Sequence, residues 1–444
     1  MKFLFEDQEG FTNFVSCADL NASGIRRFTP SPIVTTMLRY KVVGDNFDNI
    51  DWGDICHFKV ASQEKNYIIA SGVAHHPNNW CGLEENNQIS LFNFLNPKYL
   101  RDLRNNEALL LLDQSHEGYQ TTWLWQWFHN ECDKFKINPD RIIFVTGNLA
   151  ARDQYSEWCK EHKVQDKLFV IPHPQFENMV CHIAINRVRI HRKPHLPTFE
   201  QQYEYKQENL ANIKSYNALQ KRPRAHRIWF YKNLVDAGIL PHGIISMNAF
   251  NGQKSYYEHR YLTEDESKKL NAGLPILPPG EKIEDVNEFE DIDSGKFQFM
   301  FSEHIMLDTW MSVISESSFS EWEHACFISE KSFKPIACHH PFIIFGNKHS
   351  LRYLRELGYK TFSPFIDETY DELNTWERLE AIIFAIKKVI NIPIDQKLEW
   401  YKGMEEILKH NYQTLIRNSQ TNVPNSMIDI QNYYQRKFNV RSTV

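Results

Sequence analysis

The chain has 444 residues, of which 42% are hydrophobic and 14% aromatic, and its formal net charge is −6. At about 100–200 residues per domain, this length predicts two or three domains with cores of their own. The apolar content excludes an intrinsically disordered chain. The acidic balance argues against a dedicated nucleic-acid binder, because phosphate backbones attract a basic surface.

The cysteines and the N-terminus bear on the compartment. None of the eight cysteines forms a Cys-x-x-Cys pair or has zinc-finger spacing with histidine, which indicates reduced thiols in an intracellular protein. The first residues are too few and too acidic for a signal peptide. No run approaches the roughly 18 apolar residues of a membrane span. We therefore expect a cytoplasmic protein with no membrane span.

The first half of the chain has the pattern of a parallel sheet. Residues 1–98 are of unclear type, and we assign them to the first domain. Residues 99–198 then alternate apolar runs with helical patterns: strands at 108–112, 141–146 and 168–171, and helices at 121–134 and 151–161. Strands that are apolar throughout indicate a sheet covered on both faces. We predict a Rossmann-like acceptor domain without the G-x-G-x-x-G fingerprint, ending in a basic crossover at 187–197.

A second pattern of the same kind covers residues 199–390, which we interpret as the donor domain. Its expected elements are a helix at 224–234 ended by Gly238, strands at 243–246 and 309–314, a helix from Glu330, a buried strand ending at Gly346, and helices at 351–357 and 370–390. Residues 278–294 are expected to form an acidic loop. Residues 391–444 form a C-terminal helix, at about 394–416, and a tail. The predicted fold class is α/β, with two doubly wound Rossmann-like domains, a cleft between them and C-terminal helices.

The pair Glu330-Lys331 falls where a helix is expected to begin. A helix N-terminus offers free backbone N–H groups and a partial positive charge, which suit a phosphate. A lysine there adds a point charge for the phosphate, and the adjacent carboxylate can accept hydrogen bonds from a ribose. This combination favours a nucleotide-diphosphate donor, although an ordinary surface pair at a helix start is the alternative.

A second basic cluster precedes the helix expected at 224–234. It contains Arg222, Arg224, His226 and Arg227. Cations are disfavoured at a helix N-terminus, and a bound anion would remove the conflict. The planar guanidinium group suits bidentate phosphate binding. Taken alone, the cluster favours a solvated basic turn over an anion site.

Together these segments resemble the donor domain of α1,3-fucosyltransferase-like glycosyltransferases. That family reads roughly Asn-x-x-x-Arg-x-x-Phe-x-x-Leu, then Phe-Glu-Asn-Ser, Tyr-Val-Thr-Glu-Lys and Val-Pro-Val-Val-Tyr-Gly. This chain has Arg227-x-x-Phe-x-x-x-Leu, Ile314-Ser-Glu-Ser-Ser, Phe327-Ile-Ser-Glu-Lys and Pro341-Phe-Ile-Ile-Phe-Gly. The similarity covers about residues 215–365. It implies a GT-B fold, a nucleotide-sugar donor, inversion at the anomeric carbon and no metal within the site.

The resemblance also implies roles for individual residues. Arg227 and Lys331 would hold the donor pyrophosphate, with Arg222 and Arg224 as helpers. Glu330 would hold the ribose, and Glu316 matches the Glu of Phe-Glu-Asn-Ser. The chain departs from the family where Ser315 replaces Phe and Ser317 replaces Asn, so the fucose specificity is not carried over. Fixed cations beside the departing nucleotide would stabilise its growing charge without a metal ion.

We expect the catalytic base in the first half. Transfer with inversion needs a carboxylate or a histidine to take the proton of the acceptor hydroxyl. Glu117 lies just beyond a predicted buried strand, with Asp113 and His116 beside it. The alternative is that Asp113 or Ser115 caps the next helix. Asn148 and His173 also follow strands, and there the pattern favours caps and turns.

Three functional hypotheses therefore stand. The first is a glycosyltransferase that moves a sugar from a nucleotide-diphosphate donor to a hydroxyl of a glycan or another acceptor, without a cofactor or metal. We expect no metal at the adjacent histidine pairs, because neighbouring side chains do not converge. The second is a non-catalytic nucleotide- or glycan-binding protein on the same fold. The third is a glycosyltransferase that modifies DNA, which the basic tracts at 187–193 and 221–227 favour and the overall acidity opposes.

Overall fold

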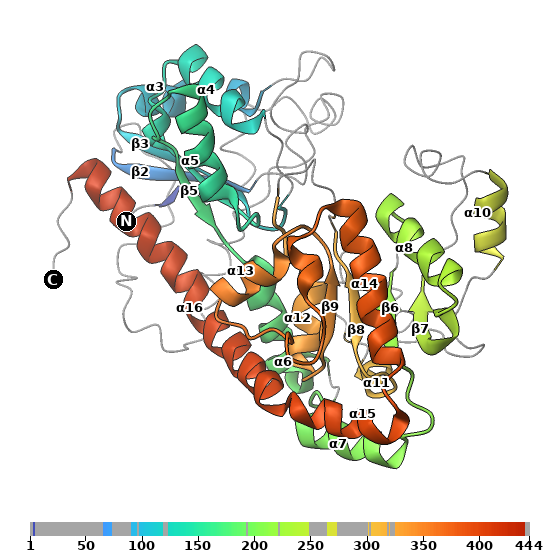
Figure 1. Ribbon diagram of the computed structural model, residues 1–444. Coiled ribbons are helices and arrows are strands. Elements are labelled where there is room, and N and C mark those ends of the chain that lie inside the picture. Colours follow the sequence, from blue (N-terminus) through green and yellow to red (C-terminus); the bar gives the residue numbers. More distant parts are fainter. Residues whose placement is uncertain are drawn as a thin grey trace. The chain divides into compact units, whose positions relative to one another are not determined.

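The computed structural model describes residues 3–4, 65–72, 90–95, 97–118, 123–191, 194–220, 223–247, 264–272, 301, 303–317, 319 and 325–439. These residues belong to two compact units (Figure 1). The first unit takes in residues up to Gln175, then Trp322–Phe327, and the chain from Gln420 onward. The second unit takes in Phe176–Glu321 and Ile328–Ser419. The predicted acidic loop at 278–294 and most of residues 1–98 lie outside the described residues.

The first unit is built on a five-stranded parallel sheet. Its strands are β1 (Phe3–Leu4), β2 (Tyr67–Gly72), β3 (Ala108–Gln114), β4 (Ile142–Thr146) and β5 (Phe169–Pro172). They lie side by side in chain order, β1-β2-β3-β4-β5. An α-helix lies in each connection from β2 to β5: α3 (Pro97–Arg104) before β3, α4 (Leu124–Phe135) before β4 and α5 (Ala151–His162) before β5.

The two faces of this sheet are covered differently. Leu110, Leu112 and Phe144 point to one face and pack with apolar residues of α3, α4 and α5. Leu109, Leu111 and Val145 point to the other face and pack against Met427, Ile430, Tyr433 and Tyr434 of the long helix α16 (Glu405–Phe438). When strands follow one another in sequence order, right-handed crossovers place every connecting helix on the same face. In a doubly wound sheet, connecting helices cover both faces. Here the C-terminal helix α16 covers the second face instead.

The second unit has a four-stranded parallel sheet with a reversal of strand order. Its strands are β6 (Tyr216–Leu219), β7 (Gly243–Ser246), β8 (Ser312–Ser315) and β9 (Phe342–Phe345), arranged β7-β6-β8-β9. The helix α8 (Ala225–Asp236) follows β6, and α12 (Glu330–Ala337) follows β8. The chain thus moves outward in opposite directions from the β6–β8 pair. Such a reversal is a topological switch point, where open α/β sheets bind ligands beyond the carboxyl ends of their strands.

The described residues include further helices (Figure 1). They are α6 (Gln175–His191), α7 (Phe199–Glu208), α10 (Glu264–Asn271), α11 (Glu303–Leu307), α13 (Ser350–Glu356), α14 (Thr375–Ile390) and α15 (Ile394–Gly403). Short 3₁₀ helices are η4 (Leu91–Phe94), η5 (Pro139–Arg141), η6 (Leu240–His242) and η10 (Thr369–Glu372). No helix among the described residues is long and apolar enough to cross a membrane.

The core of the second unit contains a buried cation. Helix α7 packs on α15, where Phe199 stacks on Tyr401 with ring centroids 5.4 Å apart. Beside them, Lys206 donates hydrogen bonds to the backbone carbonyls of Met306, Leu307 and Thr309 at 2.7–3.0 Å. Lys206 is fully buried, and this burial lowers the pKa of its ammonium group to about 7. It closes the carboxyl end of α11, whose last carbonyls lack helical partners.

The predicted α/β class, with two parallel helix-covered sheets, is confirmed. Among the elements that differ from the sequence prediction are α6, α7 and the C-terminal helix. Helix α6 extends to His191, into the predicted basic crossover, because arginine is a good helix former and no proline lies between Pro174 and Pro194. The predicted C-terminal helix is two helices, with a break between Gly403 and Glu405. The second helix extends to Phe438, so most of the predicted tail is helical. Helix α7 was not predicted, although Thr198 and Gln201 form a capping box at its start.

Candidate functional site

The candidate site lies at the carboxyl edge of the second sheet, at the β6–β8 switch point. Its centre is the segment Ser315–Ser317, which ends β8 and turns away from the sheet; we call it the β8 turn. The helices α8 and α12 follow β6 and β8, so both begin at this edge. Side chains from the first turns of these two helices meet at the β8 turn.

Three basic residues reach the β8 turn from the start of α8. Arg224 is the N-cap residue of α8, and its guanidinium group donates a hydrogen bond to the carbonyl of Ser317. His226 Nε2 lies 3.0 Å from the carbonyl oxygen of Glu316. Arg227 Nη2 donates to the same oxygen at 3.2 Å and to the carbonyl oxygen of Ser315 at 3.0 Å. The arginines are thereby fixed by the backbone of the turn.

A fourth basic residue reaches the turn from the start of α12. Lys331 Nζ lies 2.6 Å from Glu330 Oε1, 3.1 Å from Ser329 Oγ and 3.4 Å from Ser317 Oγ. Ser329 is the N-cap residue of α12, and its hydroxyl oxygen also accepts from the backbone N–H of Lys331. The side chain of Lys331 keeps 28% of its surface exposed, whereas that of Glu330 keeps 8%. Lys331 is therefore a held but accessible cation.

Two titrating groups of the site, His226 and Glu330, have shifted pKa values. Burial lowers the pKa of His226 to about 3, and the neighbouring Arg227 lowers it further, so His226 is neutral at pH 7. Burial raises the pKa of the Glu330 carboxyl, but Lys331 and Lys334 outweigh it, and the net effect is a lowered pKa. The first turn of α8 holds no acidic residue. The arginines there face the positive end of the helix dipole, a conflict that an anion would relieve.

Glu316 is enclosed by hydrogen-bond donors. Its side chain has no exposed surface, and its carboxylate accepts from Ser317, Ser329 and Ser332. Gly346, which follows β9, lies against this side chain; a Cβ atom there would come within 3.1 Å of Glu316 Cβ. The carboxylate thus ties the β8 turn to the start of α12.

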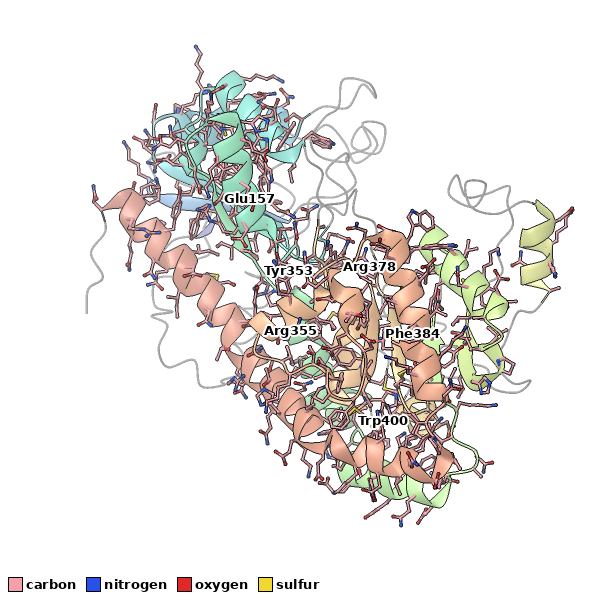
Figure 2. The ribbon with its side chains drawn as sticks, viewed as in Figure 1. Glu157, Tyr353, Arg355, Arg378, Phe384 and Trp400 are labelled. Carbon is pink, nitrogen blue, oxygen red and sulfur yellow. The ribbon has the colours of Figure 1, made fainter. Side chains whose placement is uncertain are left out.

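An aromatic layer supports the turn from below. Phe319 packs against Phe345 of β9 with ring centroids 4.1 Å apart and the rings tilted by 40°. Arg378 of α14, labelled in Figure 2, lies with its guanidinium carbon 4.6 Å from the Phe319 ring centre and donates to the Phe319 carbonyl at 3.2 Å. A buried arginine on an aromatic face combines cation–π attraction with packing. This layer leaves the turn little room to move.

The structure brings together five of the six residues predicted to bind the donor. Arg224, Arg227 and Lys331 contact the β8 turn, Glu316 belongs to it, and Glu330 contacts Lys331. Arg222 lies outside the described residues. Their accessibility differs: Arg224 is exposed and Lys331 partly exposed, whereas Arg227 and Glu316 are 4% and 0% exposed. Sequence reasoning gave no role to Ser317, Ser329 and Ser332. A serine directly before a helix start is an N-cap signal that identifies Ser329.

The residues predicted to supply the catalytic base lie at the carboxyl edge of the first sheet. Asp113 is buried in β3, and its carboxylate accepts the backbone N–H of Ser115 at 2.9 Å. His116 is exposed and Glu117 half-buried in the turn that follows. The carbonyl of Glu117 accepts the backbone N–H of Gly147, which follows β4, at 3.0 Å. The three predicted residues are therefore neighbours at one strand end.

Asn148 and His173 follow the adjacent strands and have structural roles. Asn148 Oδ1 accepts the backbone N–H groups of Ala150 and Cys326, so it organises the turn before α5. His173 is fully buried, with its two ring nitrogens 2.9 Å from Ser426 Oγ and 3.1 Å from Gln175 Oε1. Burial lowers the pKa of His173 to about 4 despite the opposing effect of Asp113. These contacts agree with the caps and turns that the sequence favoured.

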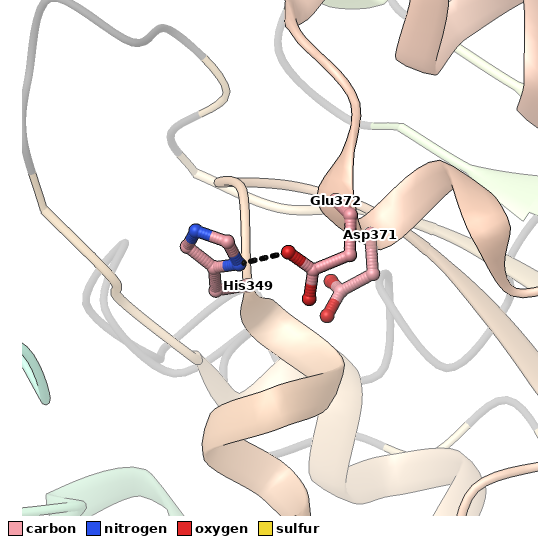
Figure 3. A group of neighbouring side chains, drawn as sticks. All are labelled: His349, Asp371 and Glu372. Atoms are coloured by element: carbon pink, nitrogen blue, oxygen red, sulfur yellow. Dashed lines mark ion pairs between the residues drawn. The ribbon is translucent and has the colours of Figure 1, made fainter.

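One group among the described residues has the composition of a metal site. His349, Asp371 and Glu372 place one ligand atom each within 4.8 Å of one another (Figure 3). The carboxylate of Asp371, however, accepts the backbone N–H groups of Leu351 and Arg352 in the first turn of α13. His349 Nδ1 lies 3.1 Å from Glu372 Oε2. Because Asp371 meets the positive end of a helix, the group is explained as a cap and an ion pair.

No family model matches the chain, and no curated protein matches it either. Solved structures with a similar arrangement include the α,α-trehalose 6-phosphate synthase of Burkholderia multivorans, with a TM-score of 0.37 and 10% identity over 82% of this chain and 71% of that one. Another is the UDP-forming synthase of Burkholderia vietnamiensis, at 0.34 and 10% over 95% and 83%. A third is the UDP-GlcNAc 2-epimerase of Neisseria meningitidis bound to UDP-GlcNAc, at 0.33 and 11% over 97% and 100%. At such TM-scores the likeness carries no argument about activity.

Proposed function

We propose that this protein is a glycosyltransferase that uses a nucleotide-diphosphate sugar, and that the β8 turn with the first turns of α8 and α12 binds the diphosphate. The observation that carries the proposal is the convergence of Arg224, Arg227 and Lys331 on the carbonyl and hydroxyl groups of one turn at a topological switch point. A cluster of this kind, with a partly exposed lysine at a helix start, provides positive charge for phosphate oxygens.

The chemistry follows from the charges. When the anomeric carbon leaves the donor, negative charge grows on the departing nucleoside diphosphate. Lys331 and Arg224 are exposed enough to contact it, while Arg227 contributes its charge from a buried position. Cations fixed in advance stabilise this charge without reorganisation during the reaction. Transfer with inversion and without a metal is part of the proposal, and so is Glu117 as the base that takes the acceptor proton.

The resemblance to α1,3-fucosyltransferase-like enzymes supports the proposal at the residues that it matches. Lys331 and Glu330 lie at the start of α12, as Ser/Thr-Glu-Lys requires, and Arg227 lies in the first turn of α8. The sugar is left open, because Ser315 and Ser317 replace the family's Phe and Asn. A non-catalytic nucleotide-binding protein would have the same donor site and would differ only in turnover.

The test is binding of nucleoside diphosphates to the wild type and to Lys331→Ala, measured by calorimetry with and without Mg²⁺. Loss of a charge-assisted hydrogen bond costs about 1.5–3 kcal/mol, so we expect roughly 10- to 100-fold weaker binding in the variant. The matched control is Lys232→Ala on α8, because Lys232 is also 28% exposed and also pairs with a carboxylate, that of Asp236. Equal binding by both variants would exclude the site.

A further inference from the structure

The buried carboxylate of Glu316 accepts four hydrogen bonds from the serines around it. Oε1 accepts the backbone N–H of Ser329 at 3.0 Å and the hydroxyl of Ser332 at 2.6 Å. Oε2 accepts the hydroxyl of Ser329 at 2.5 Å and the backbone N–H of Ser317 at 3.2 Å. A buried charge is tolerated when it is matched by donors in this way. With no exposed surface, the carboxylate has no open side toward a ligand.

The orientation of the Ser329 hydroxyl group links Glu316 to Lys331. An ionised carboxylate can only accept, so the hydroxyl hydrogen of Ser329 must point at Glu316. The lone pairs of Ser329 Oγ are then free to accept from Lys331, whose Nζ lies 3.1 Å away and whose backbone N lies 3.4 Å away. A neutral amide at position 316 would remove this constraint. Its NH₂ group could donate to Ser329 Oγ and turn the hydroxyl hydrogen toward the ammonium group of Lys331.

We propose that Glu316 is a positioning residue for Lys331: through Ser329 it fixes the ammonium group where the diphosphate of the donor binds. This inference rests on the proposed function and refines it, since it removes Glu316 from the ligand-contacting set and adds Ser329 to the machinery. Ser317 assists, because its N–H is fixed by Glu316 and its hydroxyl oxygen lies 3.4 Å from Lys331 Nζ. Glu330 holds the same ammonium group from the other side.

The experiment compares two serines whose hydroxyl groups both donate to Glu316. The hydroxyl oxygen of Ser329 also lies within hydrogen-bond distance of Lys331 Nζ. Among the contacts of the described residues, the hydroxyl of Ser332 is joined to Glu316 and not to Lys331. Binding of UDP and GDP is measured for Ser329→Ala, Ser332→Ala, Glu316→Gln and Ser329→Thr. We expect Ser329→Ala and Glu316→Gln to weaken binding about tenfold, or about 1.4 kcal/mol. The affinity of Ser332→Ala should stay within about twofold of the wild type. Ser329→Thr should keep the wild-type affinity, because threonine retains the hydroxyl group.

A double-mutant cycle of Ser329→Ala and Lys331→Ala distinguishes positioning of the lysine from a purely structural role of Ser329. Ser329→Ala also removes the N-cap of α12, which lowers stability. If the serine acts through the lysine, Ser329→Ala has no further effect on binding in a Lys331→Ala background. Equal losses from Ser329→Ala and Ser332→Ala would overturn the inference. A loss that persists in full without Lys331 would overturn it too.

A second readout needs no nucleotide. Acetylation of Lys331 by a small reagent, followed by mass spectrometry, should accelerate several-fold in Ser329→Ala and Glu316→Gln and stay unchanged in Ser332→Ala. If the wild type binds no nucleoside diphosphate, the proposed function fails, and this readout still decides whether Glu316 positions the lysine. If the wild type binds and Lys331 reacts equally in all variants, the positioning role alone fails.

Discussion

The carboxyl edges of the two sheets are built from the same kind of parallel strand and differ in what lies beyond it. At the second sheet, strand order reverses between β6 and β8, and basic side chains from two helix starts meet there. At the first sheet the strands follow in chain order, and the turns after β3 and β4 pack directly on each other. A reversal separates the connecting helices and leaves space for a ligand, whereas a sequential order lets neighbouring turns close together.

The comparison assigns different chemistry to the two edges. Cations and helix N-termini at the second edge suit a phosphate group. The first edge offers a half-buried carboxylate, Glu117, next to an exposed histidine, His116. We therefore expect donor binding to depend on the second edge alone, and turnover to depend on both.

The largest expected effect is that of Glu117→Gln on turnover. Loss of a general base costs about 10²- to 10⁴-fold in rate, while binding of the nucleoside diphosphate should stay within about twofold. The matched control is Glu107→Gln, because Glu107 directly precedes the same strand at its amino end and pairs with Lys65. Rates of sugar release from the donor and calorimetric binding check the prediction together. Wild-type turnover by Glu117→Gln would show that Glu117 is not the catalytic base.

The glycines at the two edges predict a smaller, measurable difference in stability. A Cβ atom at Gly147 would come within 2.8 Å of both the Phe327 ring and the carbonyl oxygen of Ser115, so Gly147→Ala forces the turns apart. We expect a loss of about 1–3 kcal/mol in the free energy of unfolding, as in other overpacked sites. At Gly346 the nearest side-chain atoms are 3.0–3.2 Å away, and the loss should be smaller. Urea denaturation of both variants decides the order, and a larger loss at Gly346 would contradict it.

The smallest effect concerns pH and the buried His173. Its pKa is lowered to about 4, so between about pH 4 and its ordinary pKa of 6.5 the unfolded chain binds a proton that the folded chain does not. Stability therefore falls as the pH falls through this window, by up to about 1.4 kcal/mol per pH unit for one group. We expect His173→Gln to lose stability less steeply than the wild type between pH 6.5 and 5.5, measured by denaturation at each pH. Parallel curves would show that folding leaves the pKa of His173 unchanged.

Local patterns carried most of the fold. The apolar run at 108–112 and the segment Gly243–Ser246 are strands as predicted, and Gly238 follows α8 with a positive φ of 68°. Strand order was beyond reach, because it depends on pairings between distant residues such as Asn217 and Ser312. So was the role of α16, whose buried face is defined only by the sheet that it covers.

The site shows the same division. Glu330 and Lys331 could be read from a helix start, and Arg227 from the basic cluster beside an apolar helix. The network around Glu316 could not, since its partner Ser329 lies 13 residues further along the chain. Nothing in Ser-Glu-Ser-Ser indicates that this carboxylate is buried. Only the packing of the β8 turn against α12 shows which charges face outward and which hold the others in place.

The most direct test of the central claim is the affinity of Lys331→Ala for a nucleoside diphosphate, compared with Lys232→Ala and the wild type. The account predicts binding by the wild type without Mg²⁺, unchanged binding by Lys232→Ala, and roughly 10- to 100-fold weaker binding by Lys331→Ala. Absence of binding by the wild type, or equal affinities for all three proteins, would contradict the claim that the edge at β6 and β8 is the donor site.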